Sequence, residues 1–104
     1  MAQFIAYENG NPASRKRVPY LLDVQSDLIA AMDSRVVVPL LPAVRAGRPI
    51  DGLMPRLLVR GEAMVMDTAQ LAGVSRQVIG KQVEDLSGER ATIMAALDFL
   101  VSGI

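Results

Sequence analysis

The chain contains no cysteine, no histidine and no tryptophan. The absence of cysteine excludes disulfide frameworks and thiol nucleophiles, and the absence of histidine removes the imidazole general base and the commonest nitrogen ligand of metals. Its seven aspartates do not follow the spacing of a calcium-binding loop. We therefore expect neither a metal nor a cofactor.

Aromatic residues and excess charge are also scarce. The chain has two Phe and two Tyr, and eleven Lys plus Arg balance eleven Asp plus Glu. A neutral chain is poorly suited to hold nucleic acid through bulk charge alone. No apolar run approaches the ~20 residues of a membrane span, and no basic leader precedes the first apolar residues. These features predict a cytoplasmic protein that does not enter a membrane.

What the chain does have is material for one core. Its 104 residues are 51% hydrophobic, which suits a single domain over residues 1–104 and excludes disorder. Short β-branched apolar runs separated by turn residues predict strands. We place them at residues 3–7, 19–25 and 35–41, in a hairpin of 57–59 with 63–66 around Arg60-Gly61-Glu62, and at 74–83 with a bend at Gly80. Pro39 should mark an edge, a bulge or a corner, and residues 42–55 read as a loop.

The last segment has the periodicity of a helix. Ser87 is placed to cap it, and Ile93, Leu97, Leu100 and Ile104 form an apolar stripe with Met94 and Val101 alongside. Phe99 lies roughly opposite, with Thr92, Ala95 and Ala96, and needs a partner from this fold or from another chain. The pattern as a whole predicts a mainly β fold with a C-terminal α-helix, a small barrel or curled sheet of antiparallel strands.

Three blocks of the sequence resemble the CcdB family of gyrase-poisoning toxins, which the antitoxin CcdA neutralises. The first is Asp23-Val24-Gln25-Ser26-Asp27, preceded by Ser14-Arg15-Lys16-Arg17. The second is Arg35-Val36-Val37-Val38-Pro39-Leu40. The third contains Val78-Ile79-Gly80, Val83, Asp85-Leu86-Ser87 and Arg90, and the chain ends Gly103-Ile104. Together the blocks span almost the whole chain in the right order.

The resemblance implies an SH3-like barrel with a long C-terminal helix, a homodimer, and a toxin without catalytic residues that binds the DNA gyrase A subunit. It also implies a CcdA-like antitoxin as partner, and contact with operator DNA only together with that antitoxin. The target-binding residues that it implies are Ser26, Leu28, Ile29, Asp98, Ser102, Gly103 and Ile104. Arg15 and Arg17 are candidates for binding the antitoxin, since adjacent positive charges steer an acidic partner.

One departure from the family opens an alternative. The family ends Trp-Gly-Ile, whereas Ser102 precedes Gly103-Ile104 here, and a serine cannot supply the contact area of an interfacial aromatic. A second hypothesis is therefore a CcdB-like homologue that does not poison gyrase and serves in autoregulation or as a decoy. A third is a barrel-type endoribonuclease toxin, in which Asp67, Thr68 and an arginine would form the site.

Overall fold

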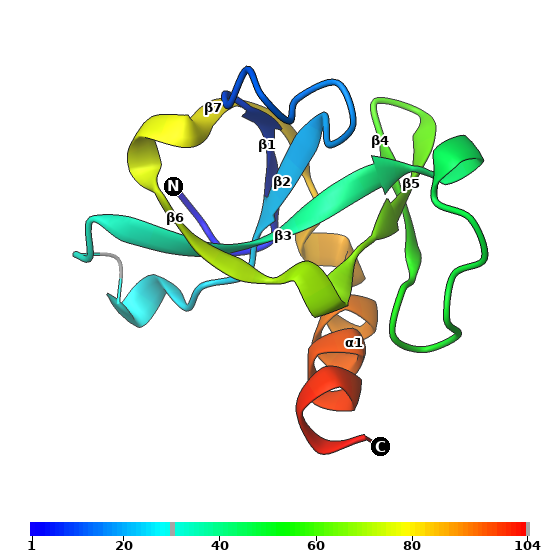
Figure 1. Cartoon of the computed structure of the whole chain (residues 1–104). Helices are drawn as coiled ribbons and strands as arrows, with labels where there is room; N and C mark the ends of the chain where they lie inside the picture. Colours follow the sequence, from blue (N-terminus) through cyan, green and yellow to red (C-terminus); the bar gives the residue numbers. More distant parts are fainter. Residues whose placement is uncertain (30, 104) are drawn as a thin grey trace.

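The computed structural model describes residues 1–29 and 31–103, and within them seven strands form one curled antiparallel sheet. The order is β4-β5-β3-β2-β1-β7, and β6 also pairs with β3. Figure 1 shows the sheet as a half-open barrel with helix α1 projecting from its lower side. The strands are β1 (Ile5–Asn9), β2 (Tyr20–Asp23), β3 (Ser34–Pro42), β4 (Arg56–Val59), β5 (Glu62–Met66), β6 (Ala72–Ser75) and β7 (Ile79–Asp85), and α1 is Arg90–Ser102. The mainly β fold with a C-terminal helix is confirmed.

Within the same described residues, five short 3-10 turns join these elements. They are η1 (Asp27–Ile29), η2 (Ala43–Arg45), η3 (Thr68–Gln70), η4 (Arg76–Val78) and η5 (Ser87–Glu89). Of the helices in the described ranges, none has the length and apolar character needed to cross a membrane.

Strand β3 organises the sheet because it has different neighbours along its two sides. One side pairs with β2, while the other pairs with β6 over residues 34–37 and with β5 over residues 40–42. Pro39 falls between these two partners, and its carbonyl accepts a hydrogen bond from the Asp67 backbone N–H at 2.9 Å. In a strand, the N–H and C=O of one residue point to the same side. The side on which proline lacks an N–H therefore faces the break between β6 and β5. For this reason an interior strand tolerates the proline that we expected at an edge, bulge or corner.

The predicted hairpin is confirmed. Val59 pairs with Glu62, and the two residues between them, Arg60 and Gly61, have φ angles of 52° and 77°. Two successive positive φ angles define the tight type I′ turn that matches the twist of the flanking strands. The glycine tolerates this conformation without strain.

The single strand expected at residues 74–83 is wrong, because β6 ends at Ser75 and β7 begins at Ile79. The break lies in η4, which the Ser75 hydroxyl caps by accepting from the Gln77 N–H at 3.2 Å. Gly80 allows a close approach instead of making the bend. A Cβ on Gly80 would lie 3.1 Å from the Glu8 carbonyl oxygen, where β1 and β7 shift register.

Helix α1 packs on the core through the predicted stripe over its first turns, where Met94 and Leu97 are partly buried against the core, but the prediction is wrong for Leu100 and Val101, which are exposed. Ile93 and Ala96 are buried, whereas Val101 is 86% exposed. The reason is that the core covers only the first half of the helix, while its last turns extend beyond the sheet (Figure 1). Phe99 is half-buried and lies beside Gly52 of the 42–55 loop. A Cβ built on Gly52 would lie 3.4 Å from the Phe99 ring. Its partner thus comes from the same chain.

The predicted Ser87 cap is also wrong. Neither η5 nor α1 has a side-chain cap hydrogen bond, and the Ser87 backbone N–H instead donates to Asp85 Oδ1 at 2.8 Å, at the end of β7. Hydrogen bonds from Ser87 lower the pKa of Asp85, because they stabilise the ionised carboxylate.

Candidate functional site

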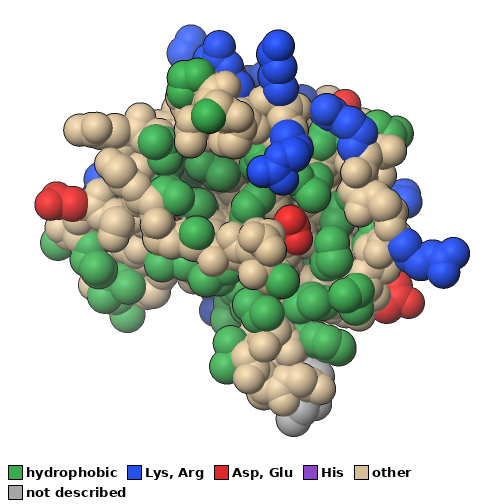
Figure 2. Space-filling view, viewed as in Figure 1, with side chains coloured by type: hydrophobic (Ala, Val, Ile, Leu, Met, Phe, Trp, Pro, Cys, Tyr) green, Lys and Arg blue, Asp and Glu red, His purple; other side chains and the backbone are tan. Residues whose placement is uncertain are grey.

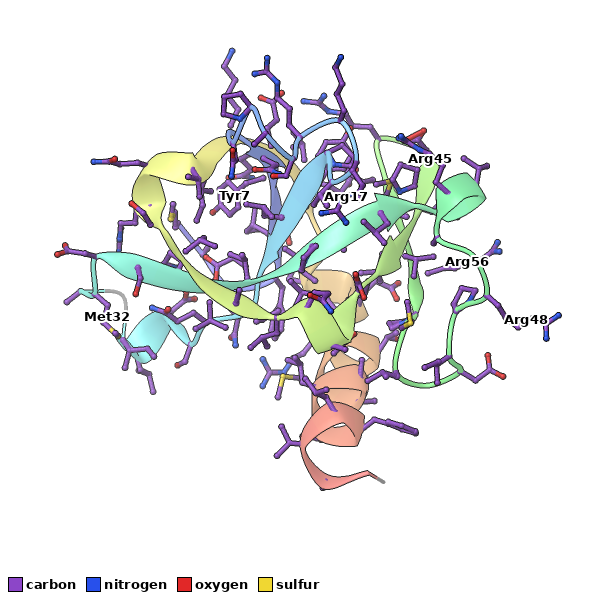
Figure 3. The ribbon with its side chains drawn as sticks, viewed as in Figure 1. Tyr7, Arg17, Met32, Arg45, Arg48 and Arg56 are labelled. Atoms are coloured by element: carbon purple, nitrogen blue, oxygen red, sulfur yellow. The ribbon has the colours of Figure 1, made fainter. Side chains whose placement is uncertain are left out.

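The first candidate surface lies at η1, just after β2. Leu28 is 96% exposed and Ile29 is 49% exposed, while Ser26 beside them is half-buried. Met32 is also exposed and lies at the far end of the molecule from Arg48 (Figure 3). Apolar side chains on adjacent exposed positions are the kind of surface that a partner protein covers.

Hydrogen bonds hold this exposed turn in shape. The Ser26 hydroxyl accepts from the Leu28 N–H at 3.2 Å, and the Ser26 carbonyl accepts from the Ile29 N–H at 3.1 Å. Gln25 is buried beneath the turn, where its Nε2 donates to the Ile29 carbonyl at 2.9 Å and its Oε1 accepts from the Val36 N–H at 3.0 Å. A buried glutamine therefore ties the turn to β3.

A buried ion pair extends this network. Arg35 donates from Nε and Nη2 to Asp23 Oδ2 at 2.9 and 2.6 Å, and both side chains are fully buried. Asp23 Oδ1 also accepts from the Gln25 N–H at 3.0 Å. Burial raises the pKa of Asp23, and the hydrogen bonds from Arg35 and Gln25 act in the opposite direction. Within residues 1–29 and 31–103, Nη1 of Arg35 is a buried side-chain atom without a hydrogen-bond partner.

Sequence reasoning did not assign Asp23, Gln25 or Arg35 to the site. A signal was available, because Asp23 closes one apolar run and Arg35 opens another. Charged side chains that interrupt buried strands need each other as partners. The spacing along the chain could not show that the resulting pair lies under η1.

The second candidate surface is the free end of α1, where Asp98, Ser102 and Gly103 are all exposed. The Ser102 hydroxyl donates to the Asp98 carbonyl at 2.7 Å. Gly103 has a φ of 73° and donates its N–H to the Phe99 carbonyl at 2.9 Å, which ends the helix in a left-handed cap. Ile104, the seventh predicted residue, lies outside the described residues. Figure 1 shows η1 and the end of α1 as separate projections on the lower side of the molecule.

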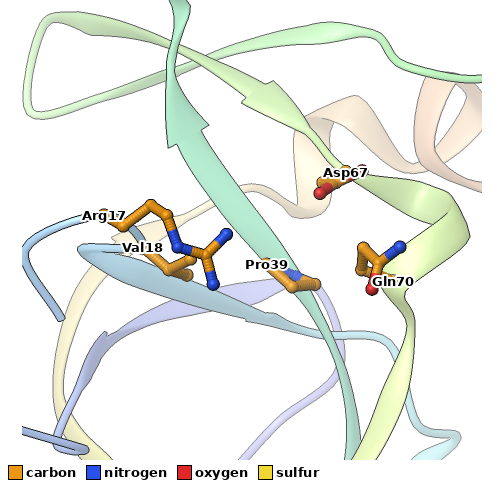
Figure 4. A pocket seen from close by; sticks show the side chains of 5 residues that line it. All are labelled: Arg17, Val18, Pro39, Asp67 and Gln70. Atoms are coloured by element: carbon orange, nitrogen blue, oxygen red, sulfur yellow. The ribbon is translucent and has the colours of Figure 1, made fainter. Parts of the chain in front are cut away.

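The predicted antitoxin residues lie elsewhere, in the loop between β1 and β2. Arg15, Lys16 and Arg17 are exposed there, and Asn9 Nδ2 braces the loop by donating to Ser14 Oγ and to the Val18 carbonyl. In Figure 2, Lys and Arg side chains gather along the upper rim of the molecule, away from α1. Figure 4 shows that Arg17 lies at a hollow lined also by Val18, Pro39, Asp67 and Gln70.

The comparison with known families decides the affiliation. A family model described as CcdB protein matches residues 3–103. The chain belongs to the CcdB family. The match includes η1, the buried ion pair and the whole of α1, so this CcdB-family chain is a toxin of the CcdB toxin–antitoxin type.

The geometry of this CcdB-family chain bears on the ribonuclease alternative. Arg17 and Asp67 line the same hollow, but Thr68 is fully buried and donates its hydroxyl to the Leu53 carbonyl at 2.5 Å. That hydroxyl is engaged in holding the loop to η3 and does not face the hollow's solvent. In the two described ranges, moreover, no three acidic side chains are grouped as a metal site would require.

Proposed function

We propose that this CcdB-family protein binds the DNA gyrase A subunit and inhibits gyrase in the cytoplasm, and that a CcdA-like antitoxin neutralises it. It acts by binding, without catalytic residues, and as a homodimer. The observation that carries the proposal is the exposed Leu28 side chain on a turn that buried groups hold in place.

A fixed apolar side chain is well suited to recognition. Leu28 is almost fully exposed, so a partner that covers it gains nearly its whole apolar area, worth about 1.5–3 kcal/mol. The hydrogen bonds of Ser26 and Gln25 fix the turn before binding, which reduces the ordering that association requires. The exposed end of α1 supplies the second part of the target surface.

The antitoxin is expected to approach the basic loop. Arg15 and Arg17 are exposed and form no ion pair within the described residues, so their charge is available to an acidic partner. Reversal of both to Glu should slow association with the antitoxin, and an unchanged association rate would contradict this assignment. Operator DNA should bind only to the complex with antitoxin, because the toxin has no net charge.

A supercoiling assay tests the main proposal. The purified protein should inhibit DNA gyrase, and Leu28→Ser should weaken binding to the gyrase A subunit by about tenfold or more. Leu58→Ser is the matched control, since Leu58 is also apolar and 63% exposed but lies on β4. Equal binding by both variants, or no inhibition by the unmodified protein, would refute gyrase as the target.

A second function, a homologue that binds antitoxin without poisoning gyrase, is favoured by the residue at the helix end. Ser102 is exposed, but its hydroxyl already bonds the Asp98 carbonyl and its side chain offers little area. Ser102→Trp should then strengthen gyrase binding by on the order of 2 kcal/mol, as for a hot-spot side chain. If the unmodified protein already inhibits gyrase fully, this second function is excluded.

A further inference from the structure

Strand β4 has one side that no other strand covers. It stands at the end of the sheet order, and in the described part of the chain it pairs with β5 alone. In a two-residue hairpin the residues that flank the turn, here Val59 and Glu62, are hydrogen-bonded to each other. The N–H and C=O groups of Arg56 and Leu58 therefore face the open side. Within residues 1–29 and 31–103, no hydrogen bond involves either N–H, so this edge is open to a further strand.

A carboxylate already occupies the turn end of this edge. The Arg60 backbone N–H donates to Glu84 Oε1 at 2.9 Å. Glu84 lies on β7, the strand at the opposite end of the sheet order, so the contact bridges the gap in the half-open barrel. The edge thus binds an anionic group at one N–H and leaves the two donors at Arg56 and Leu58 available.

The side chains of the edge alternate between the core and the solvent. Leu57 and Val59 are buried, whereas Arg56, Leu58 and Arg60 are exposed and share the outer face. Leu58 is 63% exposed, and in the described ranges neither arginine forms an ion pair. The outer face therefore presents one apolar side chain between two unpaired cations.

This charge pattern opposes a second copy of the chain at the edge. Antiparallel pairing of two β4 strands centred on Leu58 would place Arg56 directly opposite Arg60 at both ends. Like charges in directly opposed positions destabilise a sheet, whereas opposite charges stabilise it. A strand with a carboxylate two residues before and two residues after an apolar residue would oppose both arginines favourably.

The groove beside the edge restricts the occupant further. A cavity of about 290 Å³ lies between β4 and η5, and the buried Leu57 and Leu86 border it. Asp85 and Glu89 are exposed on its far side. These two carboxylates would repel acidic side chains that turn toward η5, so only the outer face of an added strand can carry acidic residues.

We propose that β4 binds an extended segment of a partner protein by strand addition, and that the segment reads acidic, uncharged, apolar, uncharged, acidic over five residues. Hydrogen bonds to the main chain of Arg56 and Leu58 supply affinity, and the outer side chains supply specificity. The surface is separate from η1, from the end of α1 and from the basic loop, so the inference goes beyond the proposed function.

Amide hydrogen exchange of the full-length protein, followed by NMR, tests the proposal. The probe is acetyl-Glu-Thr-Leu-Thr-Glu-amide, and its neutral and reversed matches carry Gln or Lys in place of Glu. The acidic peptide should slow exchange at the Arg56 and Leu58 amides with a Kd in the millimolar range. It should bind at least about threefold more tightly than the neutral peptide at low ionic strength. The amides of Leu57 and Val59 already face β5 and serve as the internal reference.

Two variants localise the effect. Leu58→Pro removes an outward N–H without touching the ladder to β5, and it should weaken all three peptides by about fivefold. Arg56→Gln combined with Arg60→Gln should abolish the preference for the acidic peptide. Its matched control is Arg45→Gln combined with Arg48→Gln, because both arginines are exposed on the same side of the molecule but lie in the 42–55 segment (Figure 3).

Four results would overturn the proposal. The acidic peptide leaves exchange at Arg56 and Leu58 unchanged, or the neutral or Lys peptide binds as tightly as the acidic one. The control double variant removes the preference as fully as the edge double variant. Exchange at the two amides slows when the protein alone is concentrated, which would assign the edge to a second copy. Leu58→Pro folds, as urea denaturation reports, and still binds like the unmodified protein. Neither gyrase nor antitoxin takes part in these measurements, so a failure here is distinct from a failure of the proposed function.

Discussion

Arg35→Met is the perturbation that most directly tests how the buried network stabilises this fold. The substitution keeps an unbranched apolar stem but shortens the side chain and removes its hydrogen bonds to Asp23 Oδ2, at 2.9 and 2.6 Å. Asp23 is left fully buried with one N–H donor, that of Gln25. A buried charge without its partner typically costs about 3–5 kcal/mol.

That loss is large beside the total stability of a domain of this size, about 5–15 kcal/mol. Urea denaturation at neutral pH should therefore show a strongly lowered midpoint, and Tm should fall by about 10 °C or more. Asp23→Asn combined with Arg35→Met should recover at least half of the loss, because the amide still accepts from Gln25 and carries no charge. Asp27→Asn is the control, since Asp27 is exposed and approaches Arg35 Nη2 only to 3.8 Å.

The pH dependence of the same variant gives an independent check. Burial already raises the pKa of Asp23, and removal of the Arg35 cation should raise it further. A folded-state pKa above the unfolded value adds stability below the unfolded pKa, and this stability is lost as the pH rises through the folded pKa. The deficit of Arg35→Met should thus shrink on acidification from about pH 7 to about pH 4. A loss below about 1 kcal/mol, or a deficit that does not change with pH, would refute the reasoning.

Three further predictions concern packing, titration and assembly. Gly80→Ala should lower stability by about 1–2 kcal/mol in urea denaturation, because its Cβ would lie 3.1 Å from Glu8, whereas Gly73→Ala should be neutral since nothing lies within 4 Å; equal effects would contradict the packing argument. The lowered pKa of Asp85 contributes stability above the unfolded pKa that is lost as the pH falls through the folded pKa, so Asp85→Asn should flatten the stability decline below about pH 4; an unchanged decline counts against the hydrogen bonds from Ser87 to Asp85. Light scattering should give a mass about twice 11.2 kDa, and the mass of one chain would exclude the homodimer.

Local rules predicted the elements whose geometry a few neighbouring residues determine. The turn at Arg60 and Gly61 is one, because its positive φ angles depend on residues that are adjacent in the chain. The type of α1 is another. The far end of its buried stripe was misjudged because helical periodicity does not show where the core ends, and Leu100 and Val101 are exposed.

The candidate site was predictable only in part. Leu28 and Ile29 were chosen from the family resemblance, and both side chains are exposed in the structure. The ion pair of Asp23 with Arg35 beneath them depends on the pairing of β2 with β3, and local sequence patterns do not show which strands pair. The hollow at Arg17 depends on β3 changing partner at Pro39, and the sequence showed only that the proline needed an irregular place in the sheet.

The network under η1 couples the stability of the fold to the shape of the proposed target surface. The backbone N–H of Gln25 donates to Asp23 Oδ1 at 3.0 Å, which fixes Gln25 in place. The side-chain Nε2 of Gln25 in turn donates to the Ile29 carbonyl at 2.9 Å and fixes the turn. Substitutions at Arg35 should therefore weaken binding and stability together, whereas substitutions at Leu28 should weaken binding alone, because an exposed side chain contributes little to folding. A fold of this size thus holds an exposed apolar turn in place through its buried polar network.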